Sequence, residues 1–96
     1  MGTTIGFINR SSTITLGGTS QELVAYNFDR RYLFIANPNL TIKLYVRIGT
    51  VDAEEAGVGD IPIYPGGSLT FKEWITPDAI EIFSTLTGHK FTCYEI

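Results

Sequence analysis

A strict alternation of apolar and polar side chains in residues 42–48 most restricts how this chain folds. In an extended strand this period of two puts one set on each face: Ile42, Leu44, Val46 and Ile48 against Lys43, Tyr45 and Arg47. No segment keeps helical periodicity over three turns, and the best candidate, residues 51–56, ends at Gly57 after a single turn. The pattern therefore predicts β structure.

Turn residues cut the rest of the chain into similar short runs. Pro65 fixes a turn-compatible φ and Gly66-Gly67 tolerates a left-handed backbone, so the chain reverses there. Strands are expected at residues 3–8, 12–16, 22–26, 32–37, 42–48, 61–64, 68–72, 80–82 and 91–94. Eight or nine short strands, about ten residues apart, are typical of an all-β, antiparallel β-sandwich or barrel, and the alternation does not separate these two.

Composition narrows the class of protein. With 96 residues, 44% of them apolar and 18% charged, the chain suits one domain with a real core. The formal net charge of −3 gives no general attraction to DNA or RNA, so no nucleic-acid partner is expected. Neither a signal sequence nor an apolar run of about 20 residues is visible. We therefore expect synthesis in a cytoplasm and no membrane partner.

The expected strand 32–37 is apolar on both faces. If residues 33 and 35 enter the core, Tyr32 and Phe34 lie outside it and form an exposed apolar patch. Either the N-terminal segment or another subunit is expected to cover this patch, and Tyr45 is a candidate member of it.

Trp74 is the one tryptophan and lies where a strand gives way to a loop. Its ordinary place is in or partly in the core, and the alternative is an exposed anchor for a partner, because tryptophan is enriched in binding hot spots. The interface candidates are therefore Tyr32, Phe34, Tyr45 and Trp74.

Residues able to do chemistry are few. His89, the one histidine, follows Gly88 in an expected turn and is expected to be exposed and structurally neutral. Cys93 lies four residues further along the same strand, about 13 Å away, so the two cannot form a nucleophile–base pair. Cys93 is the single cysteine and is expected to be a small core residue. The sequence therefore predicts no catalytic residue.

Carboxylates cluster in one loop, whose spacing matches no calcium loop and whose glycines make it flexible: Asp52, Glu54, Glu55 and Asp60, with Gly57 and Gly59. We expect a solvated loop, with a weak cation site or a partner contact as the alternative. Glycine-rich phosphate loops are absent from the sequence. No metal or cofactor is therefore expected.

Basic residues are spread along the chain. Arg30-Arg31 follows Asp29, so an ion pair with Asp29 or a neighbouring acid is the expected role. Lys43 and Arg47 flank Tyr45 on one face. These three residues form either the solvent-exposed face of a surface strand or a surface that stacks on a sugar or a base.

Several runs follow one another in a familiar order. An arginine-led strand ends in Asn at residues 30–37, a strand ends in Ile-Gly at 45–49, a Pro-Gly-Gly-Ser turn occupies 65–68, and Ala-Ile-Glu-Ile occupies 79–82. This order resembles small virion proteins of tailed bacteriophages, of the decoration, cement or tail-accessory kind. The resemblance covers residues 16–96 and implies one jelly-roll-like sandwich domain without an active site. Residues 1–15 fall outside it and are expected to form an N-terminal arm or the first strands.

The resemblance also implies a function. The expected protein is a non-enzymatic structural component of a phage particle, a capsid decoration or cement protein that stabilises the shell. Its expected partners are copies of itself, as a dimer or trimer, and the major capsid protein or a tail component. It would be made in the host bacterial cytoplasm and carried in the virion. The alternative is a carbohydrate-binding or host-recognition module that uses Tyr45 with Lys43 and Arg47, or Trp74.

Overall fold

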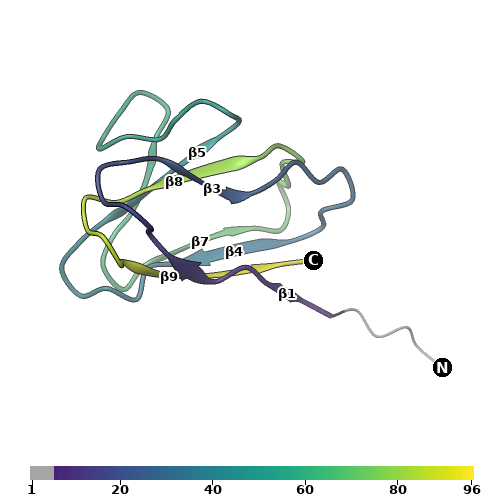
Figure 1. Ribbon diagram of the computed structural model, residues 1–96. Coiled ribbons are helices and arrows are strands. Elements are labelled where there is room, and N and C mark those ends of the chain that lie inside the picture. Colours follow the sequence, from purple (N-terminus) through teal and green to yellow (C-terminus); the bar gives the residue numbers. More distant parts are fainter. Residues whose placement is uncertain (1–5) are drawn as a thin grey trace.

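The computed structural model describes residues 6–96, which form two antiparallel sheets packed face to face (Figure 1). Nine strands lie in these residues: β1 (Ile8–Asn9), β2 (Ser12–Thr13), β3 (Gln21–Val24), β4 (Leu33–Ala36), β5 (Leu44–Ile48), β6 (Ile61–Ile63), β7 (Ser68–Phe71), β8 (Ile80–Phe83) and β9 (Lys90–Glu95). Within this part of the chain no helix is long and apolar enough to cross a membrane. The all-β prediction is confirmed, and two separate sheets decide for a sandwich over a closed barrel.

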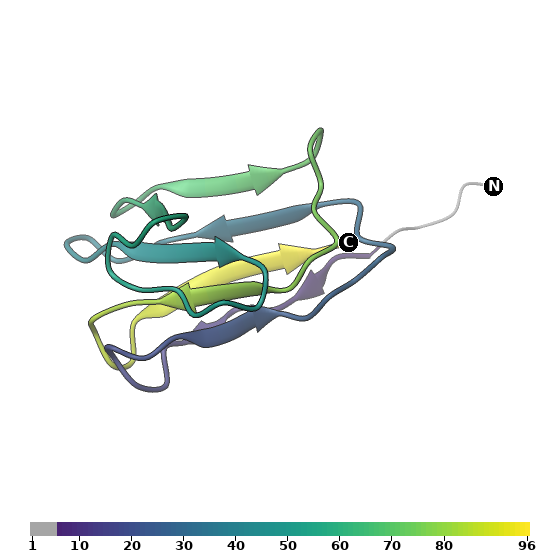
Figure 2. The same ribbon diagram turned by 90° about the horizontal axis from the view of Figure 1, so that it is seen from above.

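The strand order is that of a jelly roll. One sheet runs β1-β9-β4-β7, with β2 also paired to β9, and the other runs β3-β8-β5-β6 (Figures 1 and 2). Because β1 and β2 pair with the same neighbour, they act as one interrupted strand that lies beside the last strand. From β2 onward the chain changes sheet at every connection except β5 to β6, which gives the two interlocked Greek keys of this architecture.

The period-two pattern of the sequence accounts for the core. In β4, Leu33 and Ile35 are fully buried, and Phe34 between them lies on the outer face. The other strands repeat this arrangement, so that side chains from both inner faces fill the space between the sheets: Leu23, Val24, Leu44, Val46, Ile63, Ile80, Ile82, Phe91 and Cys93.

Strand ends differ from the expected bounds. Residue 8 of the expected strand 3–8 lies in β1, and residues 3–5 lie outside the described residues. In the 42–48 run, Leu44 and Val46 are buried as predicted, but the strand begins at Leu44 and Ile48 is exposed at its end. Residues 51–56 form no helix and only a turn.

Residues 8–14 join the chain's own sandwich. β1 and β2 pair with β9, and the intervening Arg10 donates its N–H to the carbonyl of Cys93 at 2.7 Å. Ile14 is buried in the core, and the side chain of Gln21 hydrogen-bonds the backbone of Thr13 and Thr15. These contacts close the side of the sandwich where β2 and β3 lie.

At two positions the backbone geometry explains why the residue is glycine. Gly66 has φ of 75°, a left-handed conformation, and its N–H donates to Asn37 where β6 crosses over to β7. A side chain at Gly17 would collide with the backbone carbonyl of Thr85. The first glycine permits the turn of the Pro65-Gly66-Gly67 segment, and the second permits two connections to pack together.

Candidate functional site

The four interface candidates lie in three different places. Tyr32 lies just before β4 and Phe34 lies within it, and both are on the outer face of the β1-β9-β4-β7 sheet. Tyr45 belongs to β5, in the other sheet. Trp74 follows β7 in the loop toward β8. Tyr45 therefore does not share a patch with Tyr32 and Phe34, because the thickness of the sandwich separates them.

Four aromatic rings line one apolar depression, which we call the aromatic hollow: Phe7, Tyr32, Phe34 and Tyr94. Phe34 and Tyr94 are directly opposite each other in the β4–β9 pair. Phe7 packs edge-on against Tyr32 and Tyr94, with ring centroids 5.3 and 6.2 Å apart. The hollow has a volume of about 260 Å³.

The N-terminal segment covers the aromatic hollow only in part. Phe7 is itself 53% exposed and Tyr94 is 37% exposed. The sequence left two alternatives for this patch, cover by the N-terminal segment and cover by another subunit. In the described residues Phe7 covers part of the patch, and the rest of it is exposed to solvent. Sequence reasoning missed Phe7 and Tyr94. The signal for Tyr94 was its alternation with Phe91 and Cys93, which places it on the outer face of β9.

On the opposite face, Tyr45 packs against Phe83 with ring centroids 6.5 Å apart. The acidic loop lies nearby, and it is organised by an ion pair in which Arg47 Nε lies 2.9 Å from Asp60 Oδ1. Asp60 Oδ2 also accepts hydrogen bonds from the N–H groups of Glu54 and Gly57. Asp52, Glu54 and Glu55 are exposed, as expected of a solvated loop, whereas the buried carboxylate of Asp60 anchors the turn in a way that the sequence did not predict.

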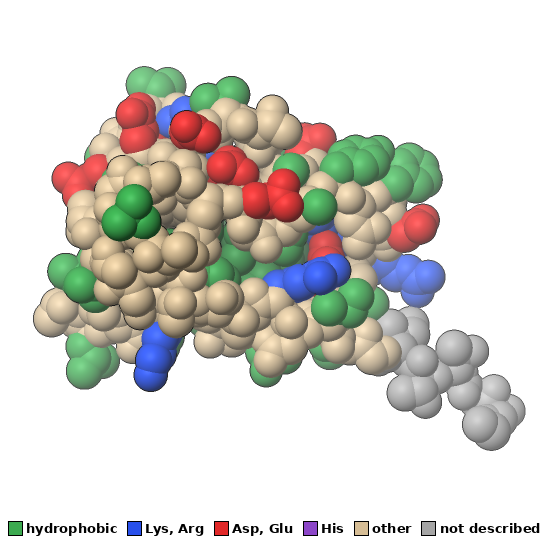
Figure 3. Space-filling model, in the orientation of Figure 1, with side chains coloured by type: hydrophobic (Ala, Val, Ile, Leu, Met, Phe, Trp, Pro, Cys, Tyr) green, Lys and Arg blue, Asp and Glu red, His purple; other side chains and the backbone are tan. Residues whose placement is uncertain are grey.

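These contacts also separate the basic residues around Tyr45. The guanidinium of Arg47 is held by Asp60 and by the carbonyl of Val58 at 2.7 Å. Lys43 Nζ lies 4.8 Å from the centroid of the Tyr64 ring, a cation–π contact. Of the acidic side chains visible in Figure 3, most lie over the layer that contains β3, β5 and β8. Lys43, Tyr45 and Arg47 therefore do not form a single surface on which a sugar or a base could stack.

His89 is buried, and the expectation of an exposed turn histidine is wrong. Its Nδ1 lies 2.7 Å from Ser84 Oγ, and its Nε2 lies 2.8 Å from Asn37 Oδ1. Burial lowers the pKa of His89 below its ordinary value, so the ring is neutral near pH 7. The three residues join the end of β4 to the β8–β9 turn.

The neighbours of Asn37 fix the tautomer of His89. The amide nitrogen of Asn37 donates to the carbonyls of Ile42 and Ile63, so its oxygen must face His89. That oxygen only accepts, so Nε2 of the imidazole carries the proton and Nδ1 accepts from the hydroxyl of Ser84. The buried polar atoms of the Ser84, His89 and Asn37 side chains are therefore all satisfied.

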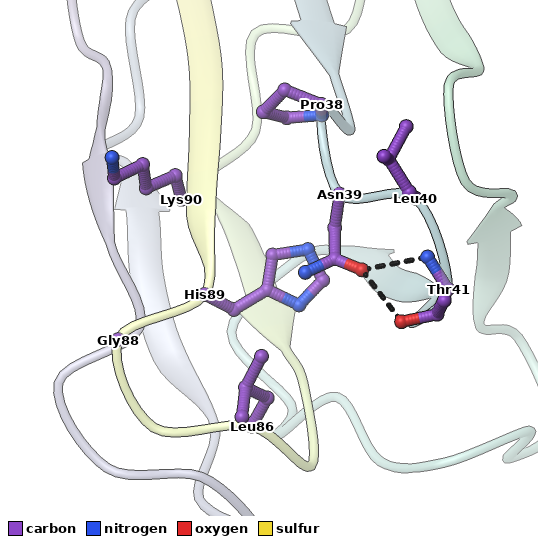
Figure 4. Close-up of a pocket in the computed structure, with 8 residues that line it drawn as sticks. All are labelled: Pro38, Asn39, Leu40, Thr41, Leu86, Gly88, His89 and Lys90. Carbon is purple, nitrogen blue, oxygen red and sulfur yellow. Dashed lines mark hydrogen bonds between the residues drawn. The ribbon is translucent and has the colours of Figure 1, made fainter.

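Serine, histidine and asparagine in this order are the groups of a nucleophilic triad, but their burial prevents that chemistry. Ser84 is 0% exposed, and its oxygen also accepts a hydrogen bond from the N–H of Leu86. A depression of about 450 Å³ lies beside the ring (Figure 4), lined by Pro38, Asn39, Leu40, Thr41, Leu86, Gly88, His89 and Lys90. Both ring nitrogens are already bonded, so the imidazole offers this depression no free donor or acceptor.

Arg30 and Glu95 form a buried ion pair at the opposite end of the sandwich, where β4 begins and β9 ends. Arg30 Nε lies 2.6 Å from Glu95 Oε2. The other guanidinium nitrogens donate to three carbonyls, those of Ala25, Thr76 and Asp78. Arg30 thus ties the loops after β3 and β7 to β9, and its partner is not Asp29 or another sequence neighbour.

The protonation of Glu95 follows from its partners. Burial raises the pKa of Glu95, but the hydrogen bond and charge of Arg30, with smaller contributions from Asn27 and Arg10, outweigh burial and hold it below its ordinary value. Cys93, two residues before, is buried in the core as predicted. Burial, followed by the negative charge of Glu95, raises the pKa of the Cys93 thiol to about 12.

Trp74 is 88% exposed, so the prediction of a place in or partly in the core is wrong. Its indole borders a shallow apolar depression of about 260 Å³ with Ile48, Phe71 and Ile75. The part of the chain that the structure describes holds no group of three or more His, Cys, Asp or Glu side chains that could bind a metal ion. Comparison of the chain with family models, curated proteins and solved structures gives no match.

Proposed function

We propose that this chain is a non-enzymatic structural protein of a tailed-phage particle, a capsid decoration or cement protein. It docks on the major capsid protein or a tail component and associates with copies of itself. The observation that carries this proposal is the aromatic hollow, a partly exposed apolar surface on the outer face of the β1-β9-β4-β7 sheet. The resemblance of residues 16–96 to small virion proteins supports the assignment to a particle.

The physics of the hollow suits adhesion. Aromatic side chains are enriched in interface cores because they bury large areas at a small cost in conformational entropy. Phe34 and Tyr94 stand on two paired central strands, so their positions are fixed before a partner arrives. Such preorganisation lowers the entropic cost of binding. A sheet face also suits the roughly 800 Å² that each partner buries in an interface of standard size.

Co-sedimentation with undecorated capsids tests this function. The wild-type protein is expected to pellet with the capsids at micromolar concentration. Tyr94→Ala, which removes one wall of the hollow, is expected to weaken binding by about tenfold or more, because its ring would be buried on docking. Phe28→Ala is the matched control, since Phe28 is an exposed aromatic residue that is not part of the hollow.

Two results would overturn parts of the proposal. A wild-type protein that stays in the supernatant with both capsids and tails removes the particle function. Equal binding by the wild type and Tyr94→Ala keeps the function but moves the docking surface elsewhere.

A carbohydrate-binding or host-recognition module is the second proposal. Its supporting observation is the exposed indole of Trp74, because a flat, exposed aromatic ring suits stacking on a sugar. A glycan array is expected to show binding that Trp74→Ala removes. An array without a single binder would rule this proposal out.

A further inference from the structure

β7 is an edge strand with unused hydrogen-bonding groups. Among the described residues only β4 pairs with it, and in Figure 2 it is the outermost strand of its sheet. Tyr32 and Ile96 exchange backbone hydrogen bonds, and Asn37 N–H donates to Gly67 on the other side of β4. By the alternation of an antiparallel ladder, Ser68 and Thr70 therefore direct their N–H and C=O groups away from β4.

The other sheet edges carry features that block pairing, and β7 carries none. β6 contains Pro62, which lacks an N–H. β3 has a bulge between Glu22 and Val24. The edge formed by β1 and β2 is interrupted at residues 10–11. By contrast, Ser68–Phe71 contains no charge, proline or irregular register.

Among the described residues, the inward side chains of β7 have no strand beside them on the side away from β4. Leu69 and Phe71 pack on the core but remain partly exposed, as does Ile61 on the facing edge strand β6. In contrast, the inward side chains of the central strand β4, Leu33 and Ile35, are fully buried. The described residues 6–96 therefore leave this side of the sandwich open, whereas they close the β2–β3 side.

We propose that β7 pairs antiparallel with β7 of a second copy of this chain about a two-fold axis. Ser68 then forms hydrogen-bonded pairs with the partner subunit's Thr70, and Thr70 with the partner subunit's Ser68. Leu69 faces the partner subunit's Leu69 on the inner side, where both gain the missing neighbour. A second copy fits this edge because a two-fold axis matches each donor to an acceptor and no charge opposes another. This inference rests on the self-association in the proposed function and gives it a surface.

Mass in solution tests the pairing. Light scattering from low micromolar to sub-millimolar concentration is expected to show a mass that rises toward twice the 10.6 kDa of the chain. Thr70→Pro removes an N–H that β4 does not use, so the fold is kept and dimerisation is expected to weaken by about tenfold or more. Thr70→Lys serves as a second variant if proline disturbs folding. Thr13→Lys, at the opposite edge of the same sheet, is the matched control and is expected to dimerise like the wild type.

Cross-linking tests the register. In Leu69→Cys the two sulfhydryl groups face each other in a non-hydrogen-bonded pair, whose Cα atoms lie about 4.5 Å apart, within the range of about 4.4–6.8 Å that a disulfide spans. Oxidation is expected to give a covalent dimer, and Thr13→Cys is expected to stay monomeric. The native Cys93 is buried and common to both variants.

Three outcomes would overturn the β7 pairing. These are a monomer at every concentration, a dimer that both Thr70 variants leave unchanged, and a Leu69→Cys variant that does not cross-link. Wild-type protein that binds capsids as a monomer would refute the pairing while the particle function stands. A β7-paired dimer that binds neither capsids nor tails would refute the particle function alone.

Discussion

Removal of Arg30 tests how far one buried ion pair holds this fold together. In Arg30→Met the apolar stem of the side chain is kept, but the carboxylate of Glu95 loses its partner at 2.6 Å while it stays buried. An uncompensated buried charge of this kind costs about 3–5 kcal/mol. Arg10 Nε remains 3.3 Å from the same carboxylate, so we expect the lower end, about 3 kcal/mol.

The measurement is urea-induced unfolding at pH 7. A domain of this size is stable by roughly 5–15 kcal/mol, so a loss of about 3 kcal/mol shifts the midpoint clearly. Arg10→Ala is the control. Its side chain is 46% exposed, and exposed ion pairs contribute about 0–1 kcal/mol.

The pH dependence adds a second, independent readout. With Arg30 present, the pKa of Glu95 is lowered, so its contribution to stability is full above the unfolded pKa and is lost as pH falls through the folded pKa. Without Arg30, burial dominates and raises the pKa of Glu95. Protonation in acid then removes the unpaired buried charge and reduces the loss of stability in the variant. The difference between the wild type and Arg30→Met is expected to shrink from pH 7 to pH 4. A loss below about 1 kcal/mol at pH 7, or a pH-independent difference, would refute this reasoning.

Four further predictions concern single residues. The thiol of Cys93, with a pKa of about 12, is expected to react with a thiol reagent at pH 8 only in urea, and rapid reaction of the native protein would contradict its burial. Because burial lowers the pKa of His89, the unfolded chain takes up its proton first, so the free energy of unfolding is expected to fall as pH drops below about 6.5; a His89→Gln variant that keeps this slope would contradict the assignment. Gly17→Ala is expected to cost about 1–3 kcal/mol in urea unfolding through its collision with Thr85, and an unchanged midpoint would show that the connection relaxes freely. Trp74→Ala is expected to change the free energy of unfolding by less than about 0.5 kcal/mol, because the indole is exposed, and a larger loss would indicate packing that the structure lacks.

The fold class was readable from local pattern. Alternation at 42–48 gave a strand because period two is a property of adjacent residues, and the Pro65-Gly66-Gly67 turn marked a reversal for a similar reason. The sequence did not give the pairing of the strands. Whether Tyr45 shares a sheet with Phe34 depends on which strands are neighbours, and the alternation of a single strand carries no such information.

Buried polar residues were the main errors, and they share one cause. His89 and Arg30 both lie in or near turns, where polar residues are usually exposed. Their partners Asn37 and Glu95 lie 52 and 65 residues away in the chain. A polar side chain becomes suitable for burial only when such a partner satisfies it, so local sequence alone predicts the wrong environment.

For the candidate site, the two-sided apolar strand correctly placed Tyr32 and Phe34 on an outer face. Phe7 and Tyr94 joined them through the pairing of β9 with β1 and β4, which the sequence does not show. The grouping of these four rings therefore required the structure.

The central proposal is that the chain docks on a phage particle through the aromatic hollow. Hydroxyl-radical footprinting of the free protein and of protein bound to undecorated capsids tests it most directly. We expect oxidation of Phe7 and Tyr94 to fall strongly on binding, while oxidation of the exposed Phe28 stays the same. Equal oxidation of Phe7 and Tyr94 in the free and bound protein would contradict the claim.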